Sequence, residues 1–236
     1  MVTRESYTRP PMHRTVPPPR QRLLVFARLP ELGAVKTRLA GSIGPERALA
    51  VYRAMLADVL AGLGTPNEDL EIEVMWAPTA AANAEALAEA FGDQALAMQT
   101  GATLGDRLSM AFSERFFFHR TEKIIAIGVD DPKLTRETID HAFGILDSCD
   151  WVVGPATDGG YYLIGCRAAP FDPSIFRDIE WGTSSVFRAT MEKIAAWGST
   201  VAVRPERTDI DVEDDLRTFS EDPAEGELAK LLRKWR

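Results

Sequence analysis

Residues 123–132, with the sequence KIIAIGVDDP, constrain the fold of this chain more than any other segment. The apolar run IIAIGV is short and rich in Ile and Val, which is typical of a strand buried on both faces of a parallel sheet. The run ends abruptly at Asp130, Asp131 and Pro132. Ligands of open parallel sheets bind beyond the carboxyl ends of the strands, where these aspartates would lie. Two carboxylates there suit a hard divalent cation that also holds phosphate, so the segment predicts a metal-dependent enzyme acting on a nucleotide or another phosphorylated compound.

The same segment has a purely structural interpretation. An aspartate before a helix is a common N-cap, and the sequence LTRETIDHAFGIL follows with helical spacing of its apolar residues Leu134, Ile139, Ala142 and Ile145. A strand, a capping aspartate and a helix alone would be ordinary α/β architecture. Only the rest of the chain can decide between the two interpretations.

The composition excludes several classes of protein. Of the 236 residues, 45% are hydrophobic and 26% are charged, as in a soluble globular protein. Residues 1–22 are Pro-rich with five Arg against one Glu, so we expect a disordered basic tail there and a single domain over residues 23–236. The formal net charge is −8, and the chain without this tail is more acidic still, which argues against a nucleic-acid-binding surface. We expect no membrane insertion, because no stretch is apolar enough to cross a bilayer.

The positions of the cysteines and histidines indicate which side chains could hold a metal. Cys149 and Cys166 lack the spacing of a metal site and lie in or beside apolar runs, so we expect buried thiols in a reducing cytosol. His13, His119 and His141 form no cluster in the sequence. A zinc site is therefore not expected, and any metal would be held by carboxylates. With no secretory signal at the N-terminus, we expect a cytoplasmic protein.

Strand and helix patterns alternate along the chain, which predicts an open, mostly parallel sheet with helices on both faces. Residues 151–166 differ, because two apolar runs are joined by ATDGG with no room for a crossover helix, so we expect a local antiparallel excursion there. The predicted strands are residues 22–27, 70–76, 95–99, 124–129, 151–155, 161–166 and 201–205, and the predicted helices include residues 45–63, 81–91 and 104–118.

The loop after the first predicted strand, PELGAVKTRL, suits a phosphate. Gly33 permits close backbone approach, and Lys36 and Arg38 place cationic donors near the carboxyl end of a strand. The loop is neither a Walker loop nor a dinucleotide-binding fingerprint. Its Lys and Arg could equally face solvent at the start of a helix.

Two further segments carry carboxylates. In GPATDGGYYLIG, Asp158 is followed by two glycines, which allow a bulge, and then by Tyr161, which can stack on a base or sugar. A DGG turn is also an ordinary hairpin connection. In TDIDVEDDLR, Asp209 and Asp211 are two residues apart and would point the same way in an extended segment. Either could supply a second metal ligand, whereas Asp211 could instead cap the following helix.

Six segments, taken in order, resemble a bacterial family of glycosyltransferase-like proteins with the GT-A fold. This family is linked to arsenosugar biosynthesis and is often labelled a domain of unknown function. The chain is also similar to guanylyltransferases that activate phospholactate or related acids in deazaflavin cofactor synthesis. The segments are FARLPELGAVKTRL, GATLGDRL, IGVDDPKLT, GPATDGGYYLIG, IEWGTSSVF and TDIDVEDDL, and they span nearly all of residues 23–216.

The resemblance implies a Rossmann-like nucleotide-diphospho-sugar transferase fold and a set of site residues. Mg²⁺ or Mn²⁺ would be held by Asp130, with Asp211 as a second ligand or structural anchor. Asp158 would face the acceptor or the metal and, with Lys36 and Arg38, would take part in catalysis. The nucleotide would lie across the first loop and the acceptor beside the DGG turn. The implied nucleotide-binding residues are Arg28, Gly33, Lys36, Arg38 and Arg107, and the implied acceptor-binding residues are Gly159, Gly160 and Tyr161.

Two residues depart from the family pattern, which usually has Lys at the position of Arg28 and a small or neutral residue at the position of Asp131. Arg28 keeps the charge but not the geometry of Lys. Asp131 precedes Pro132, which biases it to extended backbone, so Asp130 and Asp131 should point to opposite sides. We therefore expect Asp130 to bind the metal and Asp131 to cap the next helix.

These observations predict a metal-dependent transferase that uses a nucleotide-activated donor. A glycosyltransferase moving a sugar from a nucleotide-sugar to a small acceptor is favoured by the DGGYYLIG segment. A nucleotidyltransferase that joins a nucleoside monophosphate from a triphosphate to a phosphorylated small molecule fits the first loop equally well. A non-catalytic nucleotide-binding module on the same fold is the third hypothesis, because a fold does not determine function.

Overall fold

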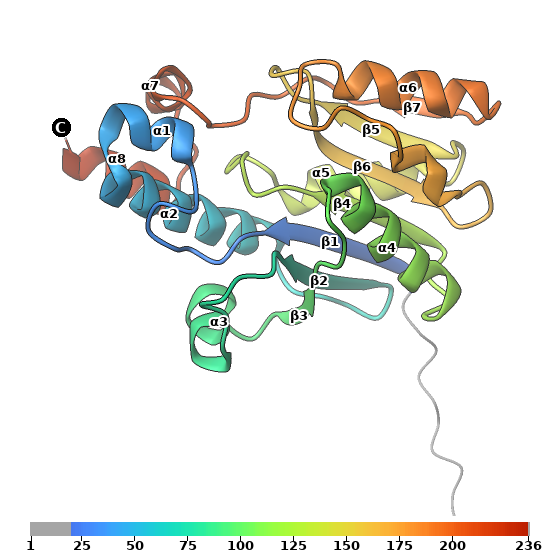
Figure 1. Ribbon diagram of the computed structural model, residues 1–236, viewed down its shortest axis with the longest axis horizontal. Helices are drawn as coiled ribbons and strands as arrows, with labels where there is room; N and C mark the ends of the chain where they lie inside the picture. Colours follow the sequence, from blue (N-terminus) through green and yellow to red (C-terminus); the bar gives the residue numbers. More distant parts are fainter. Residues whose placement is uncertain (1–19, 236) are drawn as a thin grey trace, which may run out of the picture.

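The structure is a computed structural model and describes residues 20–235. These residues form one seven-stranded sheet in the order β3-β2-β1-β4-β6-β5-β7 (Figure 1). The strands are β1 (Gln21–Ala27), β2 (Leu70–Trp76), β3 (Ala95–Met98), β4 (Lys123–Ile127), β5 (Trp151–Pro155), β6 (Tyr161–Arg167) and β7 (Val201–Val203). The helices are α1 (Thr37–Ile43), α2 (Pro45–Leu63), α3 (Ala84–Phe91), α4 (Leu104–Phe117), α5 (Arg136–Ile145), the 3-10 helix η1 (Pro173–Phe176), α6 (Val186–Ala196), α7 (Glu213–Glu221) and α8 (Glu227–Trp235).

The sheet is parallel except for β6, which runs antiparallel to both of its neighbours, β4 and β5. The predicted excursion is confirmed: β5 and β6 form a hairpin joined by residues 156–160, with a register shift at Gly154 and Pro155. Because β6 is reversed, its first residues lie at the edge of the sheet where β1, β2 and β4 end. The hairpin therefore brings the DGGYY segment to the ligand-binding edge.

The side chains of the central strands alternate between two cores, one on each face of the sheet. Leu23 and Val25 of β1 pack with α2, α3 and α5 on one face, whereas Leu24 packs with α4, η1 and α6 on the other. Strands buried on both faces need apolar residues at every position, which is why the runs in the sequence are continuous. The predicted α/β architecture with helices on both faces is confirmed.

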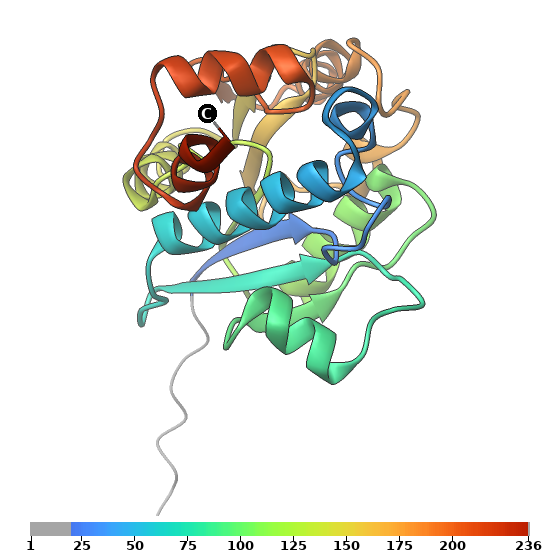
Figure 2. The same ribbon diagram turned by 90° about the vertical axis from the view of Figure 1, so that its left-hand side faces the viewer.

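A third apolar cluster lies outside the sheet. It joins α1, α2, α7 and α8 through residues such as Leu39, Met55 and Leu228. Figures 1 and 2 show these four helices gathered beside the carboxyl end of β1. The C-terminal helices thus hold the short helix α1, which follows the first loop, in place.

Two boundaries differ from the sequence expectations. β1 begins at Gln21, inside the range predicted for the basic tail, while residues 1–19 of that tail lie outside the described residues. The expectation that Asp131 caps the next helix is wrong: α5 begins at Arg136, and the side chain of Thr135 accepts the capping hydrogen bond from the Thr138 N–H. None of the helices in residues 20–235 is long and apolar enough to span a membrane.

Candidate functional site

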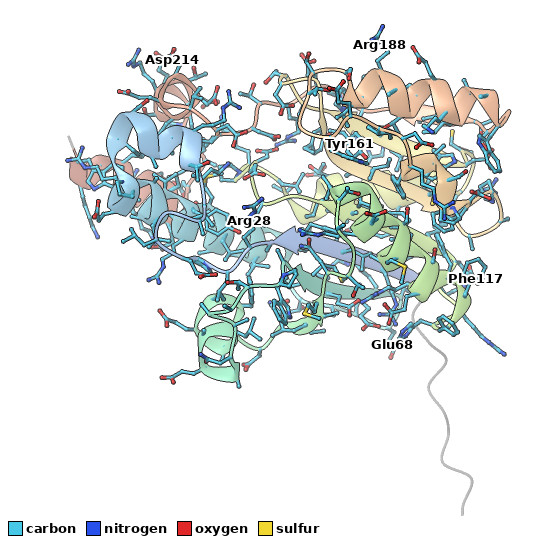
Figure 3. The ribbon with its side chains drawn as sticks, in the orientation of Figure 1. Arg28, Glu68, Phe117, Tyr161, Arg188 and Asp214 are labelled. Atoms are coloured by element: carbon cyan, nitrogen blue, oxygen red, sulfur yellow. The ribbon has the colours of Figure 1, made fainter. Side chains whose placement is uncertain are left out.

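A cavity of about 620 Å³ lies at the carboxyl ends of β1 and β4. Its wall is built from the ends of these strands, the first loop, the start of α4 and the start of β6. Figure 3 shows Arg28 at this end of the sheet, whereas Glu68 and Phe117 lie at the opposite end. Seven of the predicted site residues line it: Arg28, Lys36, Arg38, Arg107, Asp130, Tyr161 and Asp211.

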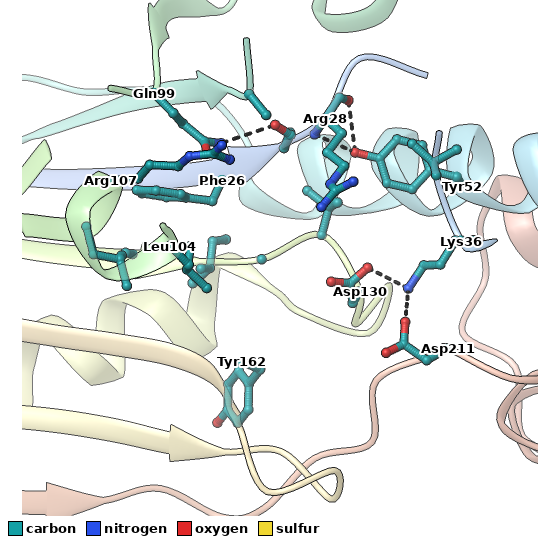
Figure 4. A pocket seen from close by; sticks show the side chains of 18 of the residues that line it. Phe26, Arg28, Lys36, Tyr52, Gln99, Leu104, Arg107, Asp130, Tyr162 and Asp211 are labelled. Atoms are coloured by element: carbon teal, nitrogen blue, oxygen red, sulfur yellow. Dashed lines mark hydrogen bonds and ion pairs between the residues drawn. The ribbon is translucent and has the colours of Figure 1, made fainter. Parts of the chain in front are cut away.

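Lys36 is the buried cation of the site. Its Nζ lies 2.5 Å from Oδ1 of Asp130 and 2.7 Å from Oδ1 of Asp211, and its side chain is only 4% exposed (Figure 4). Lys36 immediately precedes α1 and adopts a left-handed backbone conformation with φ of 46°. Burial opposes the charge of the ammonium, but the attraction of Asp130 and Asp211 outweighs it and raises the pKa of Lys36.

Asp209 lies among like charges. Burial, together with the negative charges of Asp130, Asp158 and Asp211, raises the pKa of Asp209 to about 8. Its Oδ1 is buried and has no hydrogen-bond partner among the described residues. The four aspartates therefore form one electrostatically coupled group, in which Lys36 supplies the positive charge that is closest to Asp130 and Asp211.

Asp130 and Asp131 point to different surroundings, as the sequence predicts. Asp130 is partly exposed on the cavity wall, whereas Asp131 is only 6% exposed and forms an ion pair with Arg207. Asp131 Oδ1 also accepts a hydrogen bond from the Lys133 N–H at 2.9 Å. Asp131 therefore stabilises the loop after β4 and does not face the cavity.

Two arginines in the cavity lack a carboxylate partner within residues 20–235. Arg28 donates a hydrogen bond to the carbonyl of Ala34 at 3.3 Å, and Arg107 donates to the carbonyl of Gly101 at 3.1 Å. These acceptors are neutral, so both guanidinium charges are unpaired among the residues that the structure describes. Unpaired guanidinium groups on a cavity wall are suited to an anionic ligand such as phosphate. Arg38 differs, since it lies 3.7 Å from Asp211 and its side chain is 67% exposed.

The other end of the cavity combines a fixed amide with apolar side chains. The side-chain amide nitrogen of Gln99 donates to the carbonyls of Ala27 at 3.2 Å and Met75 at 2.6 Å, so its carbonyl oxygen must face the other way. That oxygen accepts a hydrogen bond from Arg107 at 3.4 Å. Phe26 and Leu104 line the same region (Figure 4). An apolar wall with a few fixed polar groups is typical of a small-molecule site.

The DGG turn lies next to the loop that precedes α6. The Gly160 N–H donates to Oδ1 of Asp158 at 2.8 Å. Gly159 has a φ of +89°, and a Cβ there would lie 2.3 Å from the carbonyl oxygen of Ser184. Gly159 therefore allows the turn and this loop to touch. Asp158, Gly159 and Gly160 do not line the cavity, nor does Gly33 of the first loop, so their predicted substrate contacts stay predictions.

Tyr52 and Gln99 line the cavity, although neither was predicted from the sequence to be a functional residue. Gln99 comes directly after β3, so the rule that ligands bind beyond carboxyl ends could have identified it. Tyr52 lies in the middle of α2, where it reads as an ordinary core residue. No sequence signal separates it from its apolar neighbours.

Known proteins resemble this chain over most of its length. Residues 64–183 match the model of a family described as an uncharacterized protein conserved in bacteria, DUF2064. A protein of Desulfovibrio desulfuricans G20, provisionally named a nucleotide-diphospho-sugar transferase, is 32% identical, with a TM-score of 0.85 over 92% of this chain and 95% of that chain. No curated protein matches the sequence.

More distant structures share the fold alone. A cytidylyltransferase of Leptospira borgpetersenii is 11% identical, with a TM-score of 0.57 over 91% of this chain and 93% of that one. The 4-diphosphocytidyl-2C-methyl-D-erythritol synthase of Anaerococcus prevotii is 11% identical, with a TM-score of 0.53 over 84% of this chain and 94% of that one. The predicted nucleotide-diphospho-sugar transferase fold is confirmed, and the chain belongs to the DUF2064 family of bacterial proteins.

Proposed function

We propose that this chain is a metal-dependent transferase that binds a nucleotide-sugar in the cavity and transfers the sugar to a small acceptor. The observation that carries this proposal is the distribution of charge along the cavity. Among the described residues, Arg28 and Arg107 have no carboxylate partner, whereas Lys36 bridges Asp130 and Asp211 in the cavity wall. A bound nucleoside diphosphate would supply the anions that the arginines lack. The Desulfovibrio relative, whose name is that of a nucleotide-diphospho-sugar transferase, supports an enzyme of the glycosyltransferase or nucleotidyltransferase type.

The acidic residues fit a Mg²⁺ or Mn²⁺ ion that shares its ligands with the donor. Within residues 20–235, no group of three or more His, Cys, Asp or Glu side chains is arranged to hold a metal alone. However, Oδ1 of Asp130 and Oδ1 of Asp211 already converge on one positive charge, the Nζ of Lys36. Mg²⁺ in phosphate sites is commonly held by one or two carboxylates, with substrate phosphates and water completing its shell. Such an ion would neutralise the diphosphate as it leaves.

The protein's own groups divide into a donor side and an acceptor side. On the donor side, Arg28 and Lys36 would stabilise the negative charge that develops on the leaving diphosphate. On the acceptor side, Asp158 would orient or deprotonate the attacking hydroxyl. Its Oδ1 is held by the Gly160 N–H, which leaves Oδ2 for the acceptor.

Thermal stability in the presence of nucleotides tests the donor site. Nucleoside diphosphates, triphosphates and nucleotide-sugars of each base are added with and without Mg²⁺ or Mn²⁺. A ligand at 100 times its Kd should add about 2.7 kcal/mol to the free energy of unfolding. We expect a metal-dependent shift with one nucleotide-sugar that is lost in Asp130→Ala and kept in Asp214→Ala, which removes an exposed aspartate of α7.

The products separate the two transferase reactions. Glycosyl transfer releases a nucleoside diphosphate and no pyrophosphate, whereas nucleotidyl transfer from a triphosphate releases pyrophosphate. Stabilisation by a triphosphate only, with pyrophosphate release, would replace the glycosyltransferase by a nucleotidyltransferase. Binding of a nucleotide without turnover of any donor, and with Asp158→Asn unchanged, would indicate a non-catalytic module. No shift with any nucleotide would refute the donor site.

A further inference from the structure

Tyr52 makes an unusual pair of hydrogen bonds at the carboxyl end of β1. It comes from α2, it is 4% exposed, and its ring lines the cavity. Its hydroxyl accepts a hydrogen bond from the backbone N–H of Arg28 at 2.8 Å and donates one to the backbone carbonyl of Arg28 at 2.9 Å (Figure 4). One phenol therefore satisfies both backbone groups of the first residue after the strand.

The sheet cannot supply these two hydrogen bonds. The register between β1 and β4 ends at the pair Val25 and Ile127, and the register between β1 and β2 ends at the pair Ala27 and Trp76. Arg28 lies beyond both, so Tyr52 takes the place of a neighbouring strand for one residue. Burial raises the pKa of Tyr52 above its usual range, so the hydroxyl keeps the proton that it donates.

The consequence concerns the side chain of Arg28. Arg28 lines the cavity, and in the part of the chain that the structure describes its guanidinium donates only to the neutral carbonyl of Ala34, at 3.3 Å. A guanidinium that binds phosphate in a bidentate manner needs a defined direction of approach. If both backbone groups of Arg28 are held, the direction of its Cα–Cβ bond is set before the ligand arrives. Such preorganisation lowers the entropy that binding has to overcome.

We propose that Tyr52 is a positioning residue for the donor diphosphate, because its hydroxyl holds the backbone of Arg28 so that the guanidinium faces the phosphates. The inference rests on the proposed function, since it assigns a further residue to the same donor site. Tyr52 acts through Arg28 and does not need to touch the phosphates itself.

A double-mutant cycle tests this role. Binding of inorganic pyrophosphate, and of the diphosphates and parent nucleosides of adenine, cytosine, guanine and uracil, is measured by calorimetry with Mg²⁺ present. The proteins are the wild type, Tyr52→Phe, Arg28→Gln and the double variant. Thr190→Val is the control, because it also removes a buried hydroxyl that donates to a backbone carbonyl, that of Val186 at 2.9 Å, but Thr190 does not line the cavity.

We expect Tyr52→Phe to weaken diphosphate binding about tenfold, the effect of one hydrogen bond to a charged or positioning group. Nucleoside binding should stay the same, because the base does not depend on Arg28. The double variant should bind diphosphates no more weakly than Arg28→Gln alone, since residues that act as a unit are not additive. Thr190→Val should bind like the wild type.

Other outcomes overturn the inference, and they can be told apart. If Tyr52→Phe binds diphosphates as tightly as the wild type, or if the two losses add in the double variant, Tyr52 does not act through Arg28 and the donor site itself stands. If Arg28→Gln binds as tightly as the wild type, the inference fails whatever Tyr52→Phe does. If the wild type binds no diphosphate, the inference and the proposed function fail together. Tyr52→His, which keeps a ring hydrogen-bonding group, is compared in the same cycle should Tyr52→Phe not fold.

Discussion

At the scale of single residues, the site is a balance between one buried lysine and several carboxylates. Lys36 is 4% exposed and contacts Asp130 and Asp211, which are 42% and 35% exposed. Burial, and then the negative charges of Asp130, Asp158 and Asp211, raise the pKa of Asp209 to about 8. Partly buried carboxylates that repel one another destabilise the folded protein, so we expect a further bound cation to stabilise it at this position.

Lys36→Met tests that balance. We expect the substitution to lower the free energy of unfolding by about 1 to 3 kcal/mol, because Asp130 and Asp211 lose their shared partner. Added Mg²⁺ should restore more stability to this variant than to the wild type, and urea unfolding with and without Mg²⁺ measures both effects. Lys230→Met is the control, since it removes an exposed lysine that contacts Glu227 at 2.7 Å, and its stability should not change. Equal effects of Mg²⁺ on Lys36→Met and the wild type would contradict the assignment of Asp130 and Asp211 as metal ligands.

At the scale of elements, the reversed strand β6 brings the DGG turn to the edge of the sheet where the cavity lies, and the turn contacts α6 there. The hairpin between β5 and β6 is short, and the Gly159 carbonyl accepts a hydrogen bond from the Phe187 N–H at 2.9 Å at the start of α6. The turn and α6 are thus tied together. This contact gives Gly159 a structural role, while the substrate contacts expected of the DGG turn stay predictions.

Comparing Gly159→Ala with a second glycine variant should separate the cost of crowding the loop before α6 from the strain of a positive φ. Gly198 is the matched control, because it has a φ of +69° and no atom within 4 Å of the added Cβ. We expect Gly198→Ala to cost about 1 to 2 kcal/mol from backbone strain alone. Gly159→Ala should cost at least about 1 kcal/mol more, because its Cβ would meet the Ser184 carbonyl and overpack the contact. Urea unfolding measures the difference, and equal costs would show that the loop before α6 moves aside freely.

At the scale of the whole molecule, the C-terminal segment completes the site from a distance. Asp211 contacts Lys36 across 175 positions of sequence. The helices after Asp211, α7 and α8, pack against α1 and α2 in the third apolar cluster. The apolar core therefore holds the loop that contains Lys36 next to the C-terminal segment, and the ion pair between Lys36 and Asp211 fixes how the two segments are aligned.

Leu228→Ala should show how much this core contributes. Leu228 is fully buried in α8, so we expect its truncation to lower the free energy of unfolding by about 2 to 5 kcal/mol. Leu231→Ala, in the same helix but only partly buried, should lose clearly less. Chemical denaturation followed by circular dichroism compares the two. Equal losses would mean that α8 is held by helix propensity rather than by this core.

The sequence by itself determined the architecture and the most prominent residues of the site. Continuous apolar runs such as residues 124–127 can be buried only between two helical layers, and the position of Asp130 after such a run places it at the ligand-binding edge. The missing crossover between β5 and β6 likewise required an antiparallel pair. These inferences succeed because they depend on local periodicity and on chain length, which the sequence shows directly.

Only the tertiary structure decided which charges meet. Lys36 and Asp211 come from distant segments, and Asp131 pairs with Arg207 instead of capping α5, because side-chain partners depend on how α7 and β7 pack and not on spacing along the chain. Tyr52 shows the same limit, since its two hydrogen bonds to Arg28 form just after the end of β1, beyond its pairing with both neighbouring strands. Periodicity identifies which face of an element is buried, but the packing of one element on another determines which polar groups find each other there.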